Sequence, residues 1–308
     1  MERKHLSRLY FWLTAALCLL GTLLRAVCML TRYDATIGYF DQGFLPTASY
    51  VLYFVAVVAA IVGALLLPKD SIHPTLHTPY RAPFAYAVGL TLVAFAAVSF
   101  ASSRSALFTA AGVTELVLTL SALAATVYFP LTALRHGQYR DGLVFVGFLP
   151  LLWCMSAVAV TYSDPFVTMN SPIKVSLQMG LLGFMLILVA ELGCRLGKPV
   201  SRKAIALTGI GTYLALNASL PLLVAVSVSP DLVYTLCAVV LLAVGLYGGY
   251  MLFCYGYGPA DQACTAEAES EKEAEADSET EVEAEADSEA EVEAEADTTS
   301  DIPSDPNV

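Results

Sequence analysis

Two charged residues, Arg25 and Glu115, stand inside apolar runs of the sequence, where a charge is costly. Glu115 lies in AAGVTELVLT, residues 110–119, and Arg25 lies in LLGTLLRAVCML, residues 19–30. A charge at the centre of a membrane-spanning helix costs roughly 2.5 to 3.5 kcal/mol on insertion scales, so such residues normally face other helices and find a partner. We therefore expect both side chains to face the interior of a helical bundle.

The depths of the two charges allow them to meet. At a rise of about 1.5 Å per residue, Glu115 lies roughly 13 Å and Arg25 roughly 9 Å below the outer ends of their helices. If those helices are neighbours, a buried Arg25–Glu115 pair would fix the packing without any ligand. Alternatively, the two residues form the polar floor of an outward-facing cavity. Glu115 would then take a proton or a ligand cation, and Arg25 an anionic group.

Asn217 is a third polar residue that we expect near the middle of the membrane. One helix cannot satisfy its side-chain amide, so we expect that amide to hydrogen-bond across the bundle. Pro150 and Pro221 should kink their helices and free backbone carbonyls near the same level. These carbonyls would either line a cavity or only shape the packing.

The first outer loop, TRYDATIGYFDQGFLP at residues 31–46, gathers aromatic and acidic residues. Aromatic residues at a membrane boundary are ordinary anchors, and aspartates in a loop are ordinary solvated charges. The alternative is a lid over the outer cavity. In that interpretation Tyr39 and Phe40 make apolar contacts with a ligand, and Asp34 or Asp41 makes a polar one.

Several chemistries find no support in the sequence. His73 and His77 are four residues apart, but the prolines around them prevent a regular helix and no third ligand is adjacent, so we predict no metal site. Nucleotide-binding, nucleophile-elbow and zinc-protease motifs are missing, and we predict no catalytic residue and no cofactor. Glu191 precedes Arg195 by four residues, which indicates a pair at the cytoplasmic membrane boundary.

These residues are carried by a chain of 308 residues that is 57% hydrophobic and 14% charged. Such a composition is too apolar for a water-soluble domain. A spanning helix needs roughly 20 apolar residues, and eight segments qualify. We predict an all-α, polytopic integral membrane helix bundle within residues 1–260, with helices near 8–30, 47–67, 84–102, 106–133, 142–162, 173–194, 204–228 and 232–254.

Orientation follows from lysine and arginine, which concentrate in cytoplasmic loops. With the N-terminus inside, the cytoplasmic segments carry eleven of these residues: Arg3, Lys4, Arg8, Lys69, Arg81, Arg135, Arg140, Arg195, Lys198, Arg202 and Lys203. The opposite side holds only Arg32, Arg104 and Lys174, apart from the intramembrane Arg25. We therefore predict a multi-pass protein of the cell membrane, with both termini in the cytoplasm.

Residues 261–308 form an acidic low-complexity tail. They hold one basic residue against 19 acidic ones, whereas residues 1–260 hold 15 against 9. A segment with so little to bury cannot offset the entropy of ordering, so we predict disorder. The tail is either a solvated end or a recruiting segment for a basic cytoplasmic partner or divalent cations.

Two functions from different classes remain open. The first is binding or transport of a small molecule through an outward-facing polar pocket, formed by Glu115, Arg25 and Asn217 with the loop residues Asp34, Asp41 and Tyr39. The second is a non-transporting accessory protein whose tail recruits a partner. An intramembrane enzyme would need a nucleophile and a base, and no such pair is recognisable. The expected surroundings are the lipid bilayer, with no nucleic acid.

Overall fold

The computed structural model describes residues 2–34, 36–67, 81–103, 110–134, 145–163, 171–196, 200–225 and 232–257. The chain divides into two units, Met1–Gly258 and Pro259–Val308. The described residues all belong to the first unit. The acidic tail predicted for residues 261–308 lies outside them.

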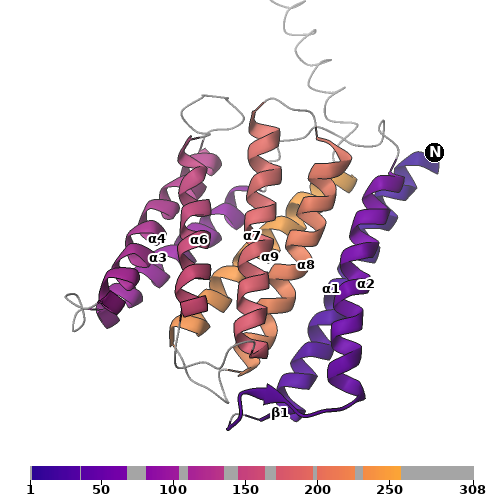
Figure 1. Cartoon of the computed structure of the whole chain (residues 1–308). Coiled ribbons are helices and arrows are strands. Elements are labelled where there is room, and N and C mark those ends of the chain that lie inside the picture. Colours follow the sequence, from indigo (N-terminus) through magenta and orange to yellow (C-terminus); the bar gives the residue numbers. More distant parts are fainter. Residues whose placement is uncertain are drawn as a thin grey trace, which may run out of the picture. The chain divides into compact units, whose positions relative to one another are not determined.

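Eight α-helices make up almost all of the described residues (Figure 1). Their bounds are α1 Glu2–Thr31, α2 Phe44–Leu66, α3 Arg81–Ser103, α4 Ala110–Leu134, α6 Phe148–Ser163, α7 Pro172–Arg195, α8 Arg202–Ala225 and α9 Leu232–Tyr257. Seven of them are long and apolar enough to cross a membrane. The chain is therefore a multi-pass membrane protein, and the predicted all-α bundle is confirmed.

Helix α6 is the exception, because its 16 residues span only about 24 Å at the usual helical rise. The hydrocarbon core of a bilayer is about 30 Å thick. The sequence predicted a spanning helix over 142–162, kinked at Pro150. Pro150 lies in the first turn of α6, and the helical conformation is interrupted just before it, because residues 145 and 146 are helical and residue 147 is in a turn.

Helices α8 and α9 occupy the centre of the bundle (Figure 1). Helix α8 packs against α1, α2, α7 and α9, and helix α9 also packs against α1, α3 and α7. The pair α1–α2 lies on one side of α8, and the group α3, α4 and α6 lies toward the other. Helix α7 connects the two sides, because it packs against both α6 and α8.

The polarity of the bundle is the inverse of that of a water-soluble protein. Its exposed side chains include many large apolar ones, such as Phe54 and Leu90, each 71% exposed. Its buried side chains include polar and charged ones, such as Arg25, Asn217 and Glu191. This pattern is expected where lipid surrounds the helices, since polar groups then find partners only inside.

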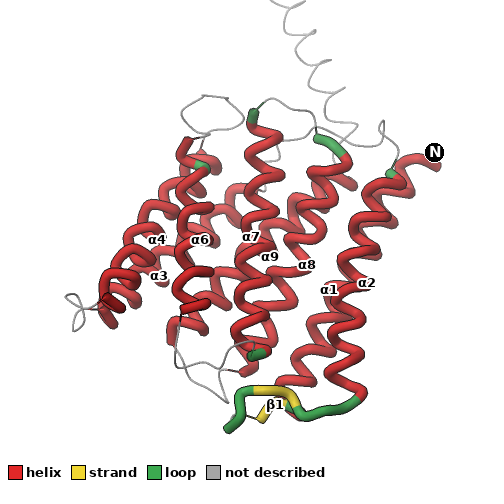
Figure 2. Tube along the Cα trace, viewed as in Figure 1, coloured by secondary structure: helices red, strands yellow, loops and turns green. Residues whose placement is uncertain are grey.

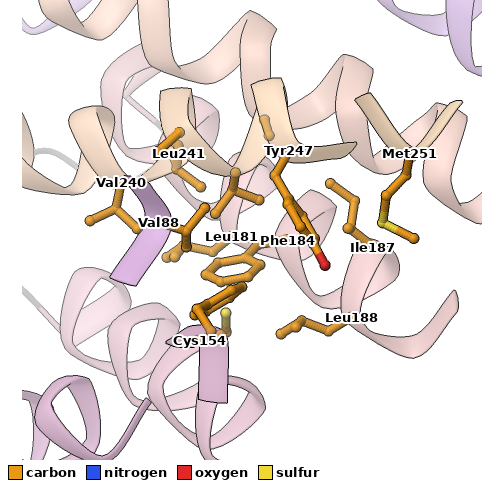
Figure 3. Packing of buried hydrophobic residues seen from close by; sticks show 14 of the residues in the cluster. Val88, Cys154, Leu181, Phe184, Ile187, Leu188, Val240, Leu241, Tyr247 and Met251 are labelled. Carbon is orange, nitrogen blue, oxygen red and sulfur yellow. The ribbon is translucent and has the colours of Figure 1, made fainter. Parts of the chain in front are cut away.

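The largest apolar core takes residues from α3, α4, α6, α7, α8 and α9, and Figure 3 shows the part to which α3, α6, α7 and α9 contribute. Val88, Cys154, Phe184 and Tyr247, one from each helix, are all buried there. The ring of Phe184 lies 5.9 Å from that of Trp153, centroid to centroid. These aromatic contacts join α6 to α7 and give this side of the bundle an apolar interior.

Helices α7 and α8 approach each other at the level of their backbones. A Cβ atom placed on Gly211 would lie 2.5 Å from the carbonyl oxygen of Gly183, and one placed on Gly183 would lie 2.7 Å from that of Gly211. Small residues permit this distance between membrane helices. The crossing fixes α7 and α8 relative to each other.

A short β-hairpin joins α1 to α2 (Figure 2). Strand β1, Tyr33–Asp34, pairs antiparallel with β2, Tyr39–Phe40. The Asp34 carboxylate accepts hydrogen bonds from the Thr36 backbone N–H at 2.8 Å and from its hydroxyl at 2.6 Å. Gly38 takes a φ of 73°, which glycine adopts without strain. The turn is therefore closed by its own residues.

Candidate binding cavity at Arg25

Arg25 is buried in the bundle, with 3% of its surface exposed. Its Nε and Nη2 atoms donate to Ser176 Oγ on α7 at 3.2 and 2.8 Å. Nη2 also donates to the Pro172 carbonyl at 3.3 Å. Both partners are neutral, and no hydrogen bond from Nη1 is present within the described part of the chain. The positive charge of Arg25 is thus held by neutral oxygens.

Two aromatic rings complete the surroundings of the guanidinium group. Its carbon lies 5.7 Å from the centre of the Phe40 ring on β2 and 5.1 Å from that of the Tyr50 ring on α2. Aromatic faces attract cations over such distances. The hairpin therefore reaches Arg25 through Phe40, one of the two aromatic residues that the lid hypothesis assigned to ligand contact.

A cavity of about 80 Å³ adjoins Arg25. We call it the Arg25 cavity, and its lining residues are Arg25, Tyr50, Tyr53, Val175, Ser176, Met179, Asn217 and Ala218. These residues come from α1, α2, α7 and α8. The volume is enough for a few water molecules or one small ion. Tyr50 and Met179 are also partly exposed at the bundle surface, at 47% and 37%.

Two buried polar atoms in the cavity wall have no hydrogen-bond partner among the described residues, namely Tyr53 Oη and Asn217 Oδ1. Buried polar groups are nearly always paired, because an unpaired one costs free energy. The Asn217 Nδ2 group donates to Tyr213 Oη at 2.8 Å. Gly21 on α1 leaves room for this pair, since a Cβ there would lie 2.7 Å from Tyr213 Oη.

The prediction that the Asn217 amide bonds across the bundle was wrong. The amide bonds within its own helix, because Tyr213 stands four residues earlier and therefore on the same face of α8. Asn217 is nevertheless almost fully buried, at 2% exposure, and its second polar atom remains unpaired within the described residues. It lines the Arg25 cavity together with Arg25, whereas the binding hypothesis placed it in a pocket that also contained Glu115.

Glu115 lies away from this cavity, on α4. Helix α4 packs mainly against α3 and α6, and α1 packs mainly against α2, α8 and α9. The Glu115 side chain is half-buried, and only its backbone carbonyl has a hydrogen bond, accepted from Thr119 Oγ1 at 2.9 Å. Arg25 binds α7 instead. The buried Arg25–Glu115 pair is therefore not formed between these two described residues.

The loop residues predicted for the site contact the hairpin and do not line the cavity. Asp34 holds the turn through Thr36, and these hydrogen bonds keep the pKa of its carboxyl below the ordinary value. Asp41 is exposed, and its backbone N–H donates to the Arg32 carbonyl at 2.7 Å. Tyr39 is 39% exposed and faces Asp34 across the hairpin. None of the three lines the Arg25 cavity.

Sequence reasoning missed most of the cavity wall. Tyr50 and Tyr53 stand in the first turns of a very apolar helix and resemble ordinary boundary aromatics. Ser176 resembles the many serines that bond to their own helix, and it does donate to the Pro172 carbonyl at 2.6 Å. The available signal was position, because each of these residues lies in the outer half of its helix, as Arg25 does.

Two further sequence predictions concern the Glu191–Arg195 pair and the histidines His73 and His77. Glu191 is fully buried near the C-terminal end of α7, and its pairing with Arg195 stays a prediction, because the Arg195 side chain lies outside the described residues. His73 and His77 lie outside them as well. In the part of the chain that is described, no group of three or more His, Cys, Asp or Glu residues could hold a metal ion.

Comparison of the chain with protein-family models, with curated proteins and with solved structures found no match. The geometry of the Arg25 cavity is therefore the basis for a function.

Proposed function

We propose that this multi-pass membrane protein binds a small molecule in the Arg25 cavity. The observation that carries the proposal is a buried arginine with neutral partners beside an 80 Å³ space, into whose wall two unpaired polar atoms are built. Charged residues inside a membrane bundle normally pair with one another or mark a ligand pathway. Unpaired polar atoms around a cavity are the groups that a ligand would satisfy.

The four helices that form the cavity bring complementary elements to it. Arg25 supplies charge, Ser176 and Pro172 hold its guanidinium in place, and Tyr53 and Asn217 offer further polar atoms. Their positions are well supported, since the α7–α8 crossing sets two of the walls. A site on packed helices is more sharply defined than one on loops. Transport would require in addition that the cavity open to both faces of the membrane.

The hairpin face of the bundle is the outer face in this proposal. The reason is the concentration of lysine and arginine in the segments on the other side, eleven against three. Reporter fusions after residues 140, 200 and 260 should then report the cytoplasm, and fusions after residues 40 and 168 the opposite side. A reversal at residues 168, 200 and 260 together, with residue 140 still in the cytoplasm, would show that α6 does not cross.

Ligand-dependent thermal shift of the purified full chain in lipid nanodiscs tests the binding function. A library of small neutral, cationic and anionic solutes should contain compounds that raise the midpoint of unfolding. Asn217→Leu should weaken that response at least tenfold, because it removes the amide from the cavity wall. Glu115→Gln should leave it unchanged. A library without any stabilising compound, or equal responses in both variants, would overturn the proposal and favour the accessory role.

A further inference from the structure

The Arg25 cavity also indicates what class of ligand it takes. We propose that it binds a small monovalent anion, either a free inorganic ion or the carboxylate of a small organic acid. This inference rests on the proposed binding function and adds the charge and size of the group recognised. Three independent features of the cavity carry it: its charge, the direction of its hydrogen-bond donors, and its volume.

The first feature is the uncompensated charge. Arginine does not lose its proton in proteins, so burial cannot neutralise Arg25 as it can neutralise a lysine or a carboxyl. Its hydrogen-bond partners, Ser176 Oγ and the Pro172 carbonyl, are neutral. The first turn of α7 lies beside Arg25, through Pro172 and Ser176, and the helix dipole adds positive potential there. Both terms favour an anion.

The second feature is the set of donors. Nη1 of Arg25 and the hydroxyl of Tyr53 have no acceptor among the described residues. Turning the Asn217 amide about its Cβ–Cγ axis would let Tyr213 donate to Oδ1 and would direct the Nδ2 donors into the cavity. The side chains of Arg25, Tyr53 and Asn217, which line the cavity from α1, α2 and α8, would then each hold a donor without an acceptor among the described residues. A cation would meet the Arg25 charge there, and a neutral solute would leave that charge uncompensated.

The third feature is the volume of about 80 Å³. It fits an ion the size of chloride, nitrate, formate or acetate, and it is too small for a sugar acid or a nucleotide. One guanidinium group balances one negative charge, which matches a monovalent ion better than sulfate or phosphate. The Phe40 and Tyr50 rings also contact the guanidinium, at 5.7 and 5.1 Å from its carbon to their centroids, and Tyr50 contributes to the cavity lining as well.

The test is a titration of the full chain in nanodiscs, at constant ionic strength, with sodium gluconate as the starting salt. Gluconate carries a six-carbon chain and exceeds the cavity. Chloride, nitrate, formate and acetate replace it in separate arms. A binding anion should raise the unfolding midpoint saturably, by about 5 °C or more at a hundredfold excess over Kd. A response to chloride or nitrate identifies a free ion, and a response to formate or acetate alone identifies a carboxylate.

Variants separate binding from packing. Arg25→Gln should abolish the anion-induced rise in the unfolding midpoint. Arg32→Gln removes an exposed arginine directly after α1 and should leave that rise unchanged. Tyr53→Phe is the sharper variant, because it removes a hydroxyl that is unpaired among the described residues. In gluconate it should be at least as stable as the parent, and its anion affinity should fall about tenfold. If Arg25→Gln does not fold, the anion affinity of Tyr53→Phe tests the inference by itself.

Two results would overturn the inference. One is the absence of a saturable shift with every small anion, and the other is an unchanged anion affinity in Tyr53→Phe. If anions fail but a neutral or cationic solute stabilises the protein through Asn217, only the ligand class is wrong and the binding function stands. If no solute of any charge stabilises the protein, both proposals fail together.

Discussion

Arg25 and Glu115 are charged residues inside apolar helices on two sides of the bundle, and their surroundings differ. Around Arg25, residues from α2, α7 and the hairpin converge on the guanidinium within hydrogen-bonding or ring-contact distance. Glu115 is half-buried on α4, and no hydrogen bond from its carboxylate to a described residue is present. A charged residue in an apolar helix thus indicates a candidate binding residue. A binding site also needs polar residues at the same depth on the neighbouring helices.

The helices on the Arg25 side are also packed more closely than those on the Glu115 side. Glycines bring α7 and α8 into backbone contact, and Gly21 admits the Tyr213–Asn217 pair beside α1. Between α3 and α4, a Cβ on Gly89 would meet Pro130 Cδ at 3.4 Å, an ordinary contact. The Arg25 side is therefore closely fitted, and the Glu115 side has room.

The largest effect should come from testing that fit directly. Gly211→Ala places a methyl group against the Gly183 carbonyl and the Ile187 backbone, so it should cost about 2 to 3 kcal/mol of unfolding free energy. Gly89→Ala should be neutral or stabilising by up to about 1 kcal/mol, because alanine is the better helix former. Reversible unfolding in mixed micelles measures both. An equal loss of unfolding free energy in the two variants would contradict the claim that α7 and α8 pack more closely than α3 and α4.

A double-mutant cycle tests the partner of Arg25. Arg25→Gln and Ser176→Ala should be coupled by about 1 to 2 kcal/mol, because they remove the two ends of the same hydrogen bonds. Arg25→Gln and Glu115→Gln should add to within about 0.5 kcal/mol, as expected for residues without shared contacts. Strong coupling in the second cycle would show that the charges do meet and would return Glu115 to the site.

A smaller effect is expected at the other end of α1. Tyr10 donates to the Ala60 carbonyl of α2 at 3.2 Å, and Tyr10→Phe should cost about 1 kcal/mol by leaving that bond unmade. Thr126 of α4 donates to the Leu123 carbonyl of its own helix, so Thr126→Val should change the free energy of unfolding by less than about 0.5 kcal/mol. The same unfolding assay compares them, and an equal loss in both would contradict the expectation that a bond between helices contributes more than a bond within one helix.

The smallest effect concerns the hairpin and its dependence on pH. The Asp34 carboxyl has a pKa below its ordinary value of 3.8, chiefly because Thr36 donates to it. A group of this kind stabilises above its unfolded pKa and loses that contribution as pH falls through the folded pKa. Amide exchange of residues 33–40, corrected for intrinsic rates, should show constant protection from pH 7 to pH 5 and a decline only below about pH 4. Asp34→Ala should remove that dependence. A decline that begins near pH 6 would require another titrating group.

Sequence reasoning reached the features that depend on local composition. The apolar runs gave the helical membrane class, and the cost of a buried charge singled out Arg25. It did not reach the neighbours of Arg25, because all the helices have apolar faces and nothing in one helix specifies which other helix it meets. Ser176 and Tyr53 became informative only when α2 and α7 were placed beside α1. For the same reason, sequence reasoning considered Glu115 and not Ser176 as the partner of Arg25.

Helix α6 has a consequence for the lipid around the protein. Its 16 residues cover about 24 Å, and its exposed face carries Phe148, Leu152, Met155 and Tyr162, so this face meets acyl chains along its whole length. Helix α9 has 26 residues, about 39 Å, and must tilt to fit the same membrane. The two helices therefore place different demands on the bilayer, and shorter acyl chains should fit the α6 face better than the α9 face.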